Sequence, residues 1–225
     1  MLILVYEVIS NDSMYCSDVS EFVYPVVRRC SDGLFHPLGT AFLLNQEGLL
    51  VTAAHVPQNN DEELYIARNK FDSIDHYQDT HDHSVGVIPA KIIKVDPFAD
   101  ICVLKTTLTV KSLLHIASSD DVSVGDEVII YGYPHFKDSR MILTQQNSTV
   151  GAKVLLGTDQ FKKKGLVINL QSTSGQSGSP VISAKDGKVV GMLVGMYSHS
   201  NNGRVLINDI DPSTLHQTTH VMSME

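Results

Sequence analysis

Short apolar runs alternate with turn-forming residues along most of the chain. Turn signals such as Ser31-Asp32-Gly33 and Lys185-Asp186-Gly187 separate runs that have the length and the β-branched content of strands. Short helices are expected only at residues 53–57, at 61–68 and in the stretch from Pro212 onward. This rhythm predicts an all-β fold, a barrel or a sandwich, with strands at residues 21–27, 39–44, 49–53, 85–95, 101–106, 127–131, 166–171 and 188–196.

Two stretches interrupt the β pattern. Residues 59–84 are polar and rich in Asp, Asn and His, so we expect a long surface loop there. Residues 116–124 contain the run Ser118-Ser119-Asp120-Asp121 between two β-rich halves. We therefore expect two lobes that meet near residues 117 and 118.

Composition limits the classes of function. The chain has 225 residues, of which 43% are hydrophobic and 19% are charged, as in ordinary globular domains. Its formal net charge of -8 disfavours binding to nucleic acid or to an anionic membrane, because both carry negative charge. The sequence leaves the oligomeric state open.

The cysteine content and the first residues bear on location. The chain has three cysteines, Cys16, Cys30 and Cys102, too few for a disulfide framework, although Cys16 and Cys30 are able to pair in principle. The opening MLILVYEVIS has no basic residue before its apolar run and lacks the pattern of a signal peptide. We expect a soluble protein in the cytoplasm.

Two segments place polar residues at strand ends. Thr52-Ala53-Ala54-His55 ends an apolar strand with a histidine, and Asp100 directly precedes the apolar run Ile101-Cys102-Val103-Leu104. A histidine at a strand end is held by the sheet and still reaches a cleft. Each residue alone also fits a simpler interpretation, His55 as an ordinary surface histidine and Asp100 as a turn residue. Asp96 is the competing acid, but Pro97 marks it as part of a turn.

A third segment carries a candidate nucleophile. In Gly175-Gln176-Ser177-Gly178-Ser179-Pro180 a serine stands between two glycines. Glycine lets the backbone turn tightly, which exposes a serine oxygen together with backbone N–H groups, as an oxyanion hole requires. The Gly-x-Ser-Gly string alone also occurs in many loops. This string indicates a nucleophile only in combination with the other two segments, because His, Asp and Ser follow in this order along the chain and each lies next to a predicted strand.

Together these three segments resemble the chymotrypsin-like, or trypsin-like, serine protease family. The stretch 124–134, Val-Gly-Asp-Glu-Val-Ile-Ile-Tyr-Gly-Tyr-Pro, is similar to the start of the second barrel in its disulfide-poor bacterial branch, the HtrA-type proteases. The resemblance covers residues 23–196. It implies a single trypsin-like peptidase domain over residues 1–225, made of two six-stranded antiparallel β-barrels with the active site between them. The lobes would span about 20–117 and 118–210, with an extension over 211–225.

The resemblance also implies the roles of individual residues. His55 would be the general base, Asp100 would orient it, and Ser177 would attack the scissile carbonyl to form an acyl-enzyme. The N–H groups of Gly175 and Ser177 would form the oxyanion hole. Gln176 stands where zymogen-activated members have an aspartate, so we expect no activation by a newly cut N-terminus. The resemblance implies a protein or peptide substrate, and neither a cofactor nor a metal.

The residues of the specificity pocket are inferred only from their positions in the chain relative to the family pattern. Gln171, six residues before Ser177, would lie at its base, and Val194 and Met196 would line its wall. Without an acid at the base and with Met196 in place of a glycine, we expect a small or medium apolar side chain before the cleaved bond.

Two other functions fit the same residues as a serine endopeptidase. The same triad would serve an esterase or an amidase, and a catalytically silent protease-like fold would bind peptides without cleaving them.

The run from Asp75 to His83 contains residue types that bind metals, but no second cluster of such residues fixes a coordination geometry, so we interpret this run as a solvated loop. The residues after Ser200 are too few for the PDZ domain that HtrA-type proteases append.

Overall fold

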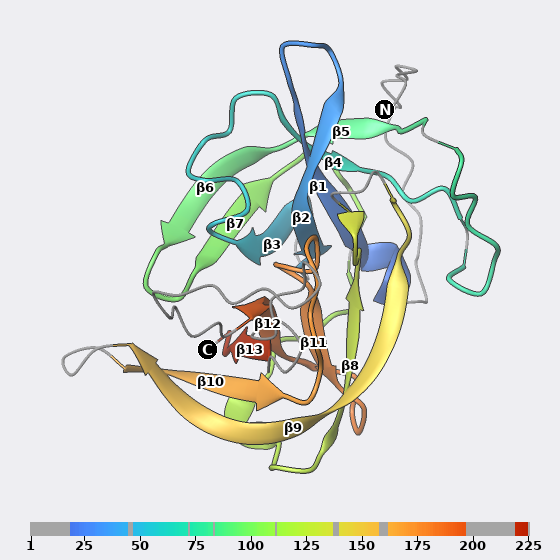
Figure 1. Cartoon of the computed structure of the whole chain (residues 1–225). Coiled ribbons are helices and arrows are strands. Elements are labelled where there is room, and N and C mark those ends of the chain that lie inside the picture. Colours follow the sequence, from blue (N-terminus) through green and yellow to red (C-terminus); the bar gives the residue numbers. More distant parts are fainter. Residues whose placement is uncertain are drawn as a thin grey trace, which may run out of the picture.

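The computed structural model describes residues 19–44, 47–71, 73–82, 84–110, 112–136, 140–157, 162–196 and 219–224. Figure 1 shows two β-sheet lobes, with β1 to β7 in the upper one and β8 to β13 in the lower one. Helical structure is sparse in the described ranges, which include the short 3-10 turns η1 (Val19–Phe22) and η2 (Ser119–Asp121). The expected all-β, two-lobed class is therefore confirmed.

The first lobe is a curled antiparallel sheet with the strand order β5-β4-β1-β2-β3-β7-β6. Its two edge strands, β5 and β6, are consecutive in the chain and separated only by Ala90. Because one residue spans so little, the two edges of the sheet must lie next to each other, which curls it into a half-barrel. The strands are β1 (Val23–Arg29), β2 (Phe35–Leu43), β3 (Leu49–Ala53), β4 (Leu64–Ala67), β5 (Val87–Pro89), β6 (Lys91–Asp96) and β7 (Ile101–Lys105).

The expected count of six strands was wrong for this lobe, which has seven. The single strand expected at residues 85–95 is divided at Ala90, whose N–H donates to the carbonyl of Leu64. In addition, the stretch 61–68, expected as a helix, contains the strand β4 at Leu64–Ala67. Leu64 and Ile66 are buried and flank the half-buried Tyr65, the period-two pattern of a strand that covers a core. Part of the expected surface loop is thus sheet.

The second lobe is a closed six-stranded barrel, as expected, with the order β10-β13-β12-β11-β8-β9. Alternate residues of its strands fill the interior, among them Val128, Ile130, Leu166 and Val181, all fully buried. Closure pairs every strand on both sides and leaves no free edge. The strands are β8 (Glu127–Gly132), β9 (Thr144–Gly157), β10 (Lys162–Ile168), β11 (Pro180–Ser183), β12 (Val189–Met196) and β13 (Thr219–Met222).

The last strand corrects the expected C-terminal extension. Residues 211–225 were assigned outside the barrel, yet Thr219–Met222 lies between β10 and β12 and pairs with both. Val221 is fully buried in the barrel interior. The strand has only four residues, too short to stand out in the sequence. The helix expected from Pro212 otherwise falls on residues outside the described ranges.

Candidate active site

His55 follows the end of β3. This strand pairs with β7 through Ala53 opposite Ile101, and the chain then turns, with the Val56 N–H donating to the Ala53 carbonyl at 3.0 Å. Residues 53–57 are thus a strand end and a turn rather than the expected short helix. Val56 is buried, whereas the His55 side chain is 49% exposed. The buried neighbour anchors the turn, and the imidazole faces outward.

Asp100 lies directly beside His55. Its carboxylate accepts two hydrogen bonds from that residue, one to Oδ2 from Nδ1 at 2.6 Å and one to Oδ1 from the backbone N–H at 2.9 Å. Its own carbonyl accepts the Ala54 N–H. Because a carboxylate only accepts, we assign the ring proton to Nδ1, which leaves Nε2 as an acceptor. Asp100 adopts φ +52, a left-handed conformation that aspartate tolerates better than most residues.

Asp96, the competing acid, forms no hydrogen bond or ion pair with His55. Its Oδ1 accepts the N–H groups of Phe98 and Ala99, and its Oδ2 pairs with Lys163 at 2.5 Å. The hydrogen bond from Lys163 holds the pKa of the Asp96 carboxyl below its usual range. Asp96 therefore shapes the turn that carries Asp100 and ties it to β10 of the second lobe.

Ser177 follows a tight turn formed by residues 173–176. The Gln176 N–H donates to the Thr173 carbonyl at 3.2 Å, and Gly175 at the third position has φ +102. Ser174 at the second position does not have positive φ, and a positive φ at the third position alone fits a type II turn, which favours glycine there. A Cβ on Gly175 would lie 2.3 Å from the Tyr133 carbonyl oxygen. Both conformation and space therefore require glycine here.

The buried side chain of Gln176 closes the same turn. Its Oε1 accepts the Thr173 N–H at 2.8 Å, and its Nε2 donates to Gln146 on β9. These neutral hydrogen bonds come from within the lobe of the turn and help to hold it. The N–H groups of Gly175 and Ser177 have no hydrogen-bond acceptor among the described residues.

Two contacts with β2 bring Ser177 toward the segment that carries His55. The Thr40 N–H donates to the Ser177 carbonyl at 2.8 Å. At Gly39 a Cβ would meet both Val56 Cγ2, at 2.7 Å, and the Ser177 carbonyl oxygen, at 2.9 Å. The residue after His55 and the backbone of Ser177 therefore pack on the same glycine. Both residues lie within the described ranges, and no hydrogen bond joins Ser177 Oγ to the His55 ring there. Catalytic hydrogen bonds often tighten only when substrate binds.

The residues expected around the specificity pocket are only partly described. Gln171 is exposed and Val194 is half-buried, and the side chain of Met196 lies outside the described set. Sequence reasoning missed Thr219 on β13. Its Oγ1 donates to the Leu170 carbonyl at 2.6 Å and accepts the Ser172 N–H at 3.1 Å. Thr219 therefore holds the loop that presents Gln171, a contact that no local motif signals.

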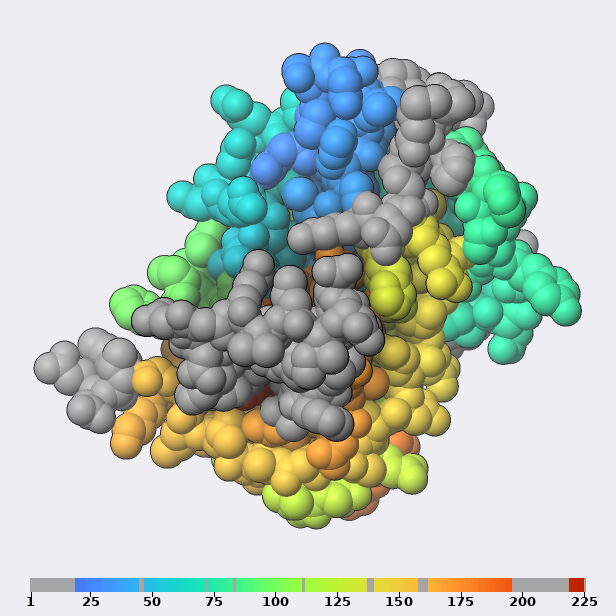
Figure 2. All heavy atoms as spheres, in the orientation of Figure 1, coloured from blue at the N-terminus to red at the C-terminus, as the bar shows by residue number. Residues whose placement is uncertain are grey.

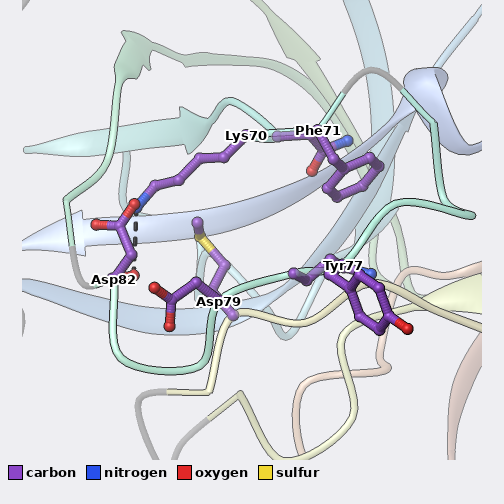
Figure 3. A pocket seen from close by; sticks show the side chains of 8 residues that line it. Lys70, Phe71, Tyr77, Asp79 and Asp82 are labelled. Atoms are coloured by element: carbon purple, nitrogen blue, oxygen red, sulfur yellow. Dashed lines mark hydrogen bonds and ion pairs between the residues drawn. The ribbon is translucent and has the colours of Figure 1, made fainter.

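A separate hollow is lined by the long segment between β4 and β5, together with Met141 from the segment before β9. Figure 3 shows Lys70 and Asp82 joined as an ion pair on one side and the rings of Phe71 and Tyr77 on the other. The same segment projects at the edge of the molecule beside the yellow β9 region in Figure 2. Gln78 exchanges two hydrogen bonds with the backbone of Leu143, at 2.9 and 2.8 Å, so this segment is tied to the second lobe.

Neither a metal cluster nor a disulfide is found among the described residues. No group of three His, Cys, Asp or Glu side chains there is arranged to hold a metal ion. Cys30 and Cys102 are free thiols, and Cys16 lies outside the described ranges. None of the helices in the described part of the chain is long and apolar enough to span a bilayer.

Comparison with curated proteins finds relatives of the expected branch. Over 164 residues the chain is 26% identical to "Probable periplasmic serine endoprotease DegP-like" of Rickettsia conorii, covering 72% of this chain and 29% of that protein. It is also 26% identical over 154 residues to "Serine protease HTRA2, mitochondrial" of Drosophila grimshawi, covering 68% and 33%. The chain thus spans about a third of these relatives. Their names give no support to the cytoplasmic location expected from the cysteine content.

Solved structures share the fold. The MamO protease domain of Magnetospirillum magneticum superposes with a TM-score of 0.60 at 17% identity, over 91% of this chain and 92% of that one. The HtrA-type protease AlgW, solved with a decapeptide, gives a TM-score of 0.66 at 16% identity, over 92% and 62%. The family model described as the trypsin-like peptidase domain matches residues 39–192, which include His55, Asp100 and Ser177. The chain therefore belongs to the trypsin-like peptidase family.

Proposed function

We propose that the protein is a serine endopeptidase that cleaves peptide bonds in protein substrates through an acyl-enzyme. The observation that carries this proposal is the His55 and Asp100 pair, in which both carboxylate oxygens accept hydrogen bonds from one histidine. A carboxylate in that position fixes the ring orientation and keeps the proton on Nδ1. The free Nε2 is the atom that a general base needs.

In the proposed reaction Ser177 is the nucleophile. Its Oγ attacks the substrate carbonyl carbon while His55 Nε2 takes the hydroxyl proton. The same proton then passes to the leaving amine, which departs and leaves an ester on Ser177. Water, activated by His55, hydrolyses that ester and regenerates the serine. Asp100 stays ionised and stabilises the imidazolium in both steps.

The oxyanion of each tetrahedral intermediate requires donors that are already in place. The N–H groups of Gly175 and Ser177 flank one peptide of the type II turn and have no acceptor among the described residues, so they are free to donate to the substrate oxygen. One such donor contributes on the order of 3 kcal/mol to transition-state stabilisation in another serine protease. The neutral hydrogen bonds of Gln176 fix this turn without a charged N-terminus, which supports activity without propeptide cleavage of the trypsin kind.

We propose a small or medium apolar residue before the cleaved bond. Gln171 offers no charge to a basic side chain, and Val194 adds an apolar wall that is half-buried. The related HtrA-type protease AlgW was solved with bound peptides, which supports a peptide or protein as the substrate class here. A cleavage profile on a peptide library reports this preference directly.

The test of the proposed function is active-site labelling. A fluorophosphonate probe should label the wild-type chain on Ser177, and Ser177→Ala should take no label while it remains folded by circular dichroism. Amide and ester substrates with the same acyl group should both be cleaved. An esterase would cleave only the ester, so cleavage of the peptide bond distinguishes an endopeptidase from an esterase. A folded wild-type protein that takes no label and cleaves no library peptide would contradict the proposal and favour a silent binding fold.

A further inference from the structure

Thr40, on β2 of the first lobe, is fully buried and uses all of its polar groups. Its N–H donates to the Ser177 carbonyl at 2.8 Å, and its own carbonyl accepts the Thr52 hydroxyl at 2.6 Å. Its Oγ1 donates to the Gly175 carbonyl at 2.8 Å and accepts the Tyr133 N–H at 3.4 Å. One side chain from the first lobe thus joins two backbone groups of the second lobe, and both belong to the surroundings of the nucleophile.

The Gly175 carbonyl is a sensitive point of the turn. It belongs to the peptide between Gly175 and Gln176, and the peptides on either side of it carry the N–H groups of Gly175 and Ser177. A glycine at φ +102 has access to many other conformations. Rotation of the central peptide would move one or both flanking N–H groups. A hydrogen bond to its carbonyl therefore restricts the conformations that the two donors sample.

A hydroxyl is the group that suits this position. It donates one hydrogen bond and accepts others at the same atom, whereas an apolar side chain of equal size would leave the Gly175 carbonyl and the Tyr133 N–H without this partner. The β-branched threonine also has few side-chain rotamers. No water reaches the fully buried Thr40 to replace the lost bonds, so the turn itself would have to rearrange.

We infer that Thr40 is a positioning residue that holds the oxyanion-binding turn of Ser177 through the Gly175 carbonyl. The inference rests on the proposed function and adds to it a contribution from the opposite lobe. Loss of the Thr40 hydroxyl should therefore destabilise the transition state rather than weaken binding of the ground-state substrate, because the oxyanion donors act on charge that develops during attack.

The test compares three variants with the wild type. Thr40→Val keeps the shape and loses the hydroxyl, and Thr40→Ser keeps the hydroxyl. Thr106→Val is the matched control, since Thr106 is also buried, donates to a glycine carbonyl, that of Gly48, and accepts a backbone N–H, that of Leu108, both at 3.3 Å. All four proteins are measured for kcat and KM on one peptide substrate, for inhibition by a peptide boronate, and for thermal unfolding.

Thr40→Val should lower kcat roughly 10- to 100-fold with KM changed less than about twofold, and weaken boronate binding in proportion to the loss of kcat/KM. Thr40→Ser should recover most of both. Thr106→Val should lose stability only. An equal loss of kcat in Thr40→Val and Thr106→Val, or failure of serine to restore it, would overturn the inference while the proposed function stands.

A readout that needs no activity separates the two hypotheses. The backbone amide signals of Gly175 and Ser177 should shift in Thr40→Val and stay near the wild-type positions in Thr40→Ser and Thr106→Val. This NMR comparison judges the role of Thr40 even if the wild-type chain proves inert, a result that would contradict only the proposed function. Unchanged amide signals in Thr40→Val would contradict the inference.

Discussion

His55 and Asp100 are joined twice, by Nδ1 to Oδ2 at 2.6 Å and by the His55 N–H to Oδ1 at 2.9 Å. The second bond places the carboxylate against the backbone of the very residue whose ring it orients. The Ala54 N–H adds a third link, to the Asp100 carbonyl. The pair is therefore a rigid unit within the first lobe, and the geometry of the His55 ring depends on Asp100 alone among the described acids.

This relationship predicts the effect of Asp100→Asn. Asparagine tolerates the positive φ of this position and keeps one oxygen for the His55 N–H, but its NH₂ group opposes the Nδ1 proton and favours the wrong tautomer. We expect kcat near neutral pH to fall about 10⁴-fold, the loss seen for such a change in another serine protease. Steady-state kinetics with active-site titration measures it.

Asp96→Asn is the matched control for that experiment. Asp96 lies next to the same turn, and its carboxylate accepts the backbone N–H groups of Phe98 and Ala99, but no hydrogen bond or ion pair joins it to His55. Its kcat should stay within about twofold of wild type, because the tautomer of His55 does not depend on it. A similar collapse in both variants would mean that Asp100 acts by holding the loop rather than the ring.

Gly175→Ala should damage activity more than stability. The added Cβ would meet the Tyr133 carbonyl oxygen at 2.3 Å and Phe136 Cβ at 2.6 Å, so the turn must move. We expect kcat/KM to fall by at least about 100-fold, as for loss of one oxyanion donor. Gly187→Ala is the control, since Gly187 also has positive φ but open space around it. It should cost about 1 kcal/mol of stability and leave kcat/KM unchanged.

The ion pair between Lys163 and Asp96 should make a small, pH-dependent contribution to stability. Both side chains are about two-fifths exposed, so Lys163→Met should lower the free energy of unfolding at pH 7 by less than about 1 kcal/mol. The folded pKa of Asp96 lies below its ordinary value of 3.8, chiefly because of the hydrogen bond from Lys163. The contribution is therefore full above about pH 4 and lost as pH falls through the folded pKa.

Urea unfolding of wild type and Lys163→Met from pH 7 to pH 2 measures this difference. The gap between the two proteins should close at the acidic end and should shrink at about 1 M salt, which screens exposed charges. A gap that persists at pH 2 would show that the Lys163 side chain stabilises the lobe contact by packing rather than by charge.

The two described cysteines should differ in reactivity. Burial raises the pKa of the Cys102 thiol to about 11, and its side chain lies inside the first sheet, whereas Cys30 is half-exposed. The thiolate is the reactive form, so iodoacetamide at pH 8 should modify Cys30 in the native protein and Cys102 only after unfolding. Peptide mapping by mass spectrometry resolves the sites, and native modification of Cys102 would contradict the burial.

Several strands were predictable and others were not. The strand expected at residues 49–53 coincides with β3, because its apolar residues sit between two clear turns. β9 was missed although it has 14 residues. Its start, Thr144-Gln145-Gln146-Asn147, is polar because much of this strand faces solvent, and its partners on β8 and β10 supply the order that its own composition does not. The formation of β9 therefore depends on its pairing with β8 and β10, which its own sequence does not reveal.

The candidate triad could be expected from sequence because each member has a local signature. His55 ends a strand, Asp100 begins one, and Ser177 stands between glycines, and the three follow in a known order. The contacts that support them have no such signature. Thr40 and Gly175 are 135 residues apart, and Thr219 and Leu170 are 49 apart.

The sequence by itself determined the all-β class, the family resemblance and the residues that are proposed to react, because strand periodicity and short glycine-containing motifs are local properties. Only the tertiary structure decided which buried hydroxyls and lysines support those residues. Closure of the barrel and curling of the sheet bring Thr40 against the Gly175 turn and Lys163 against Asp96. Such contacts depend on strand register between distant segments, and no short stretch of sequence contains that information.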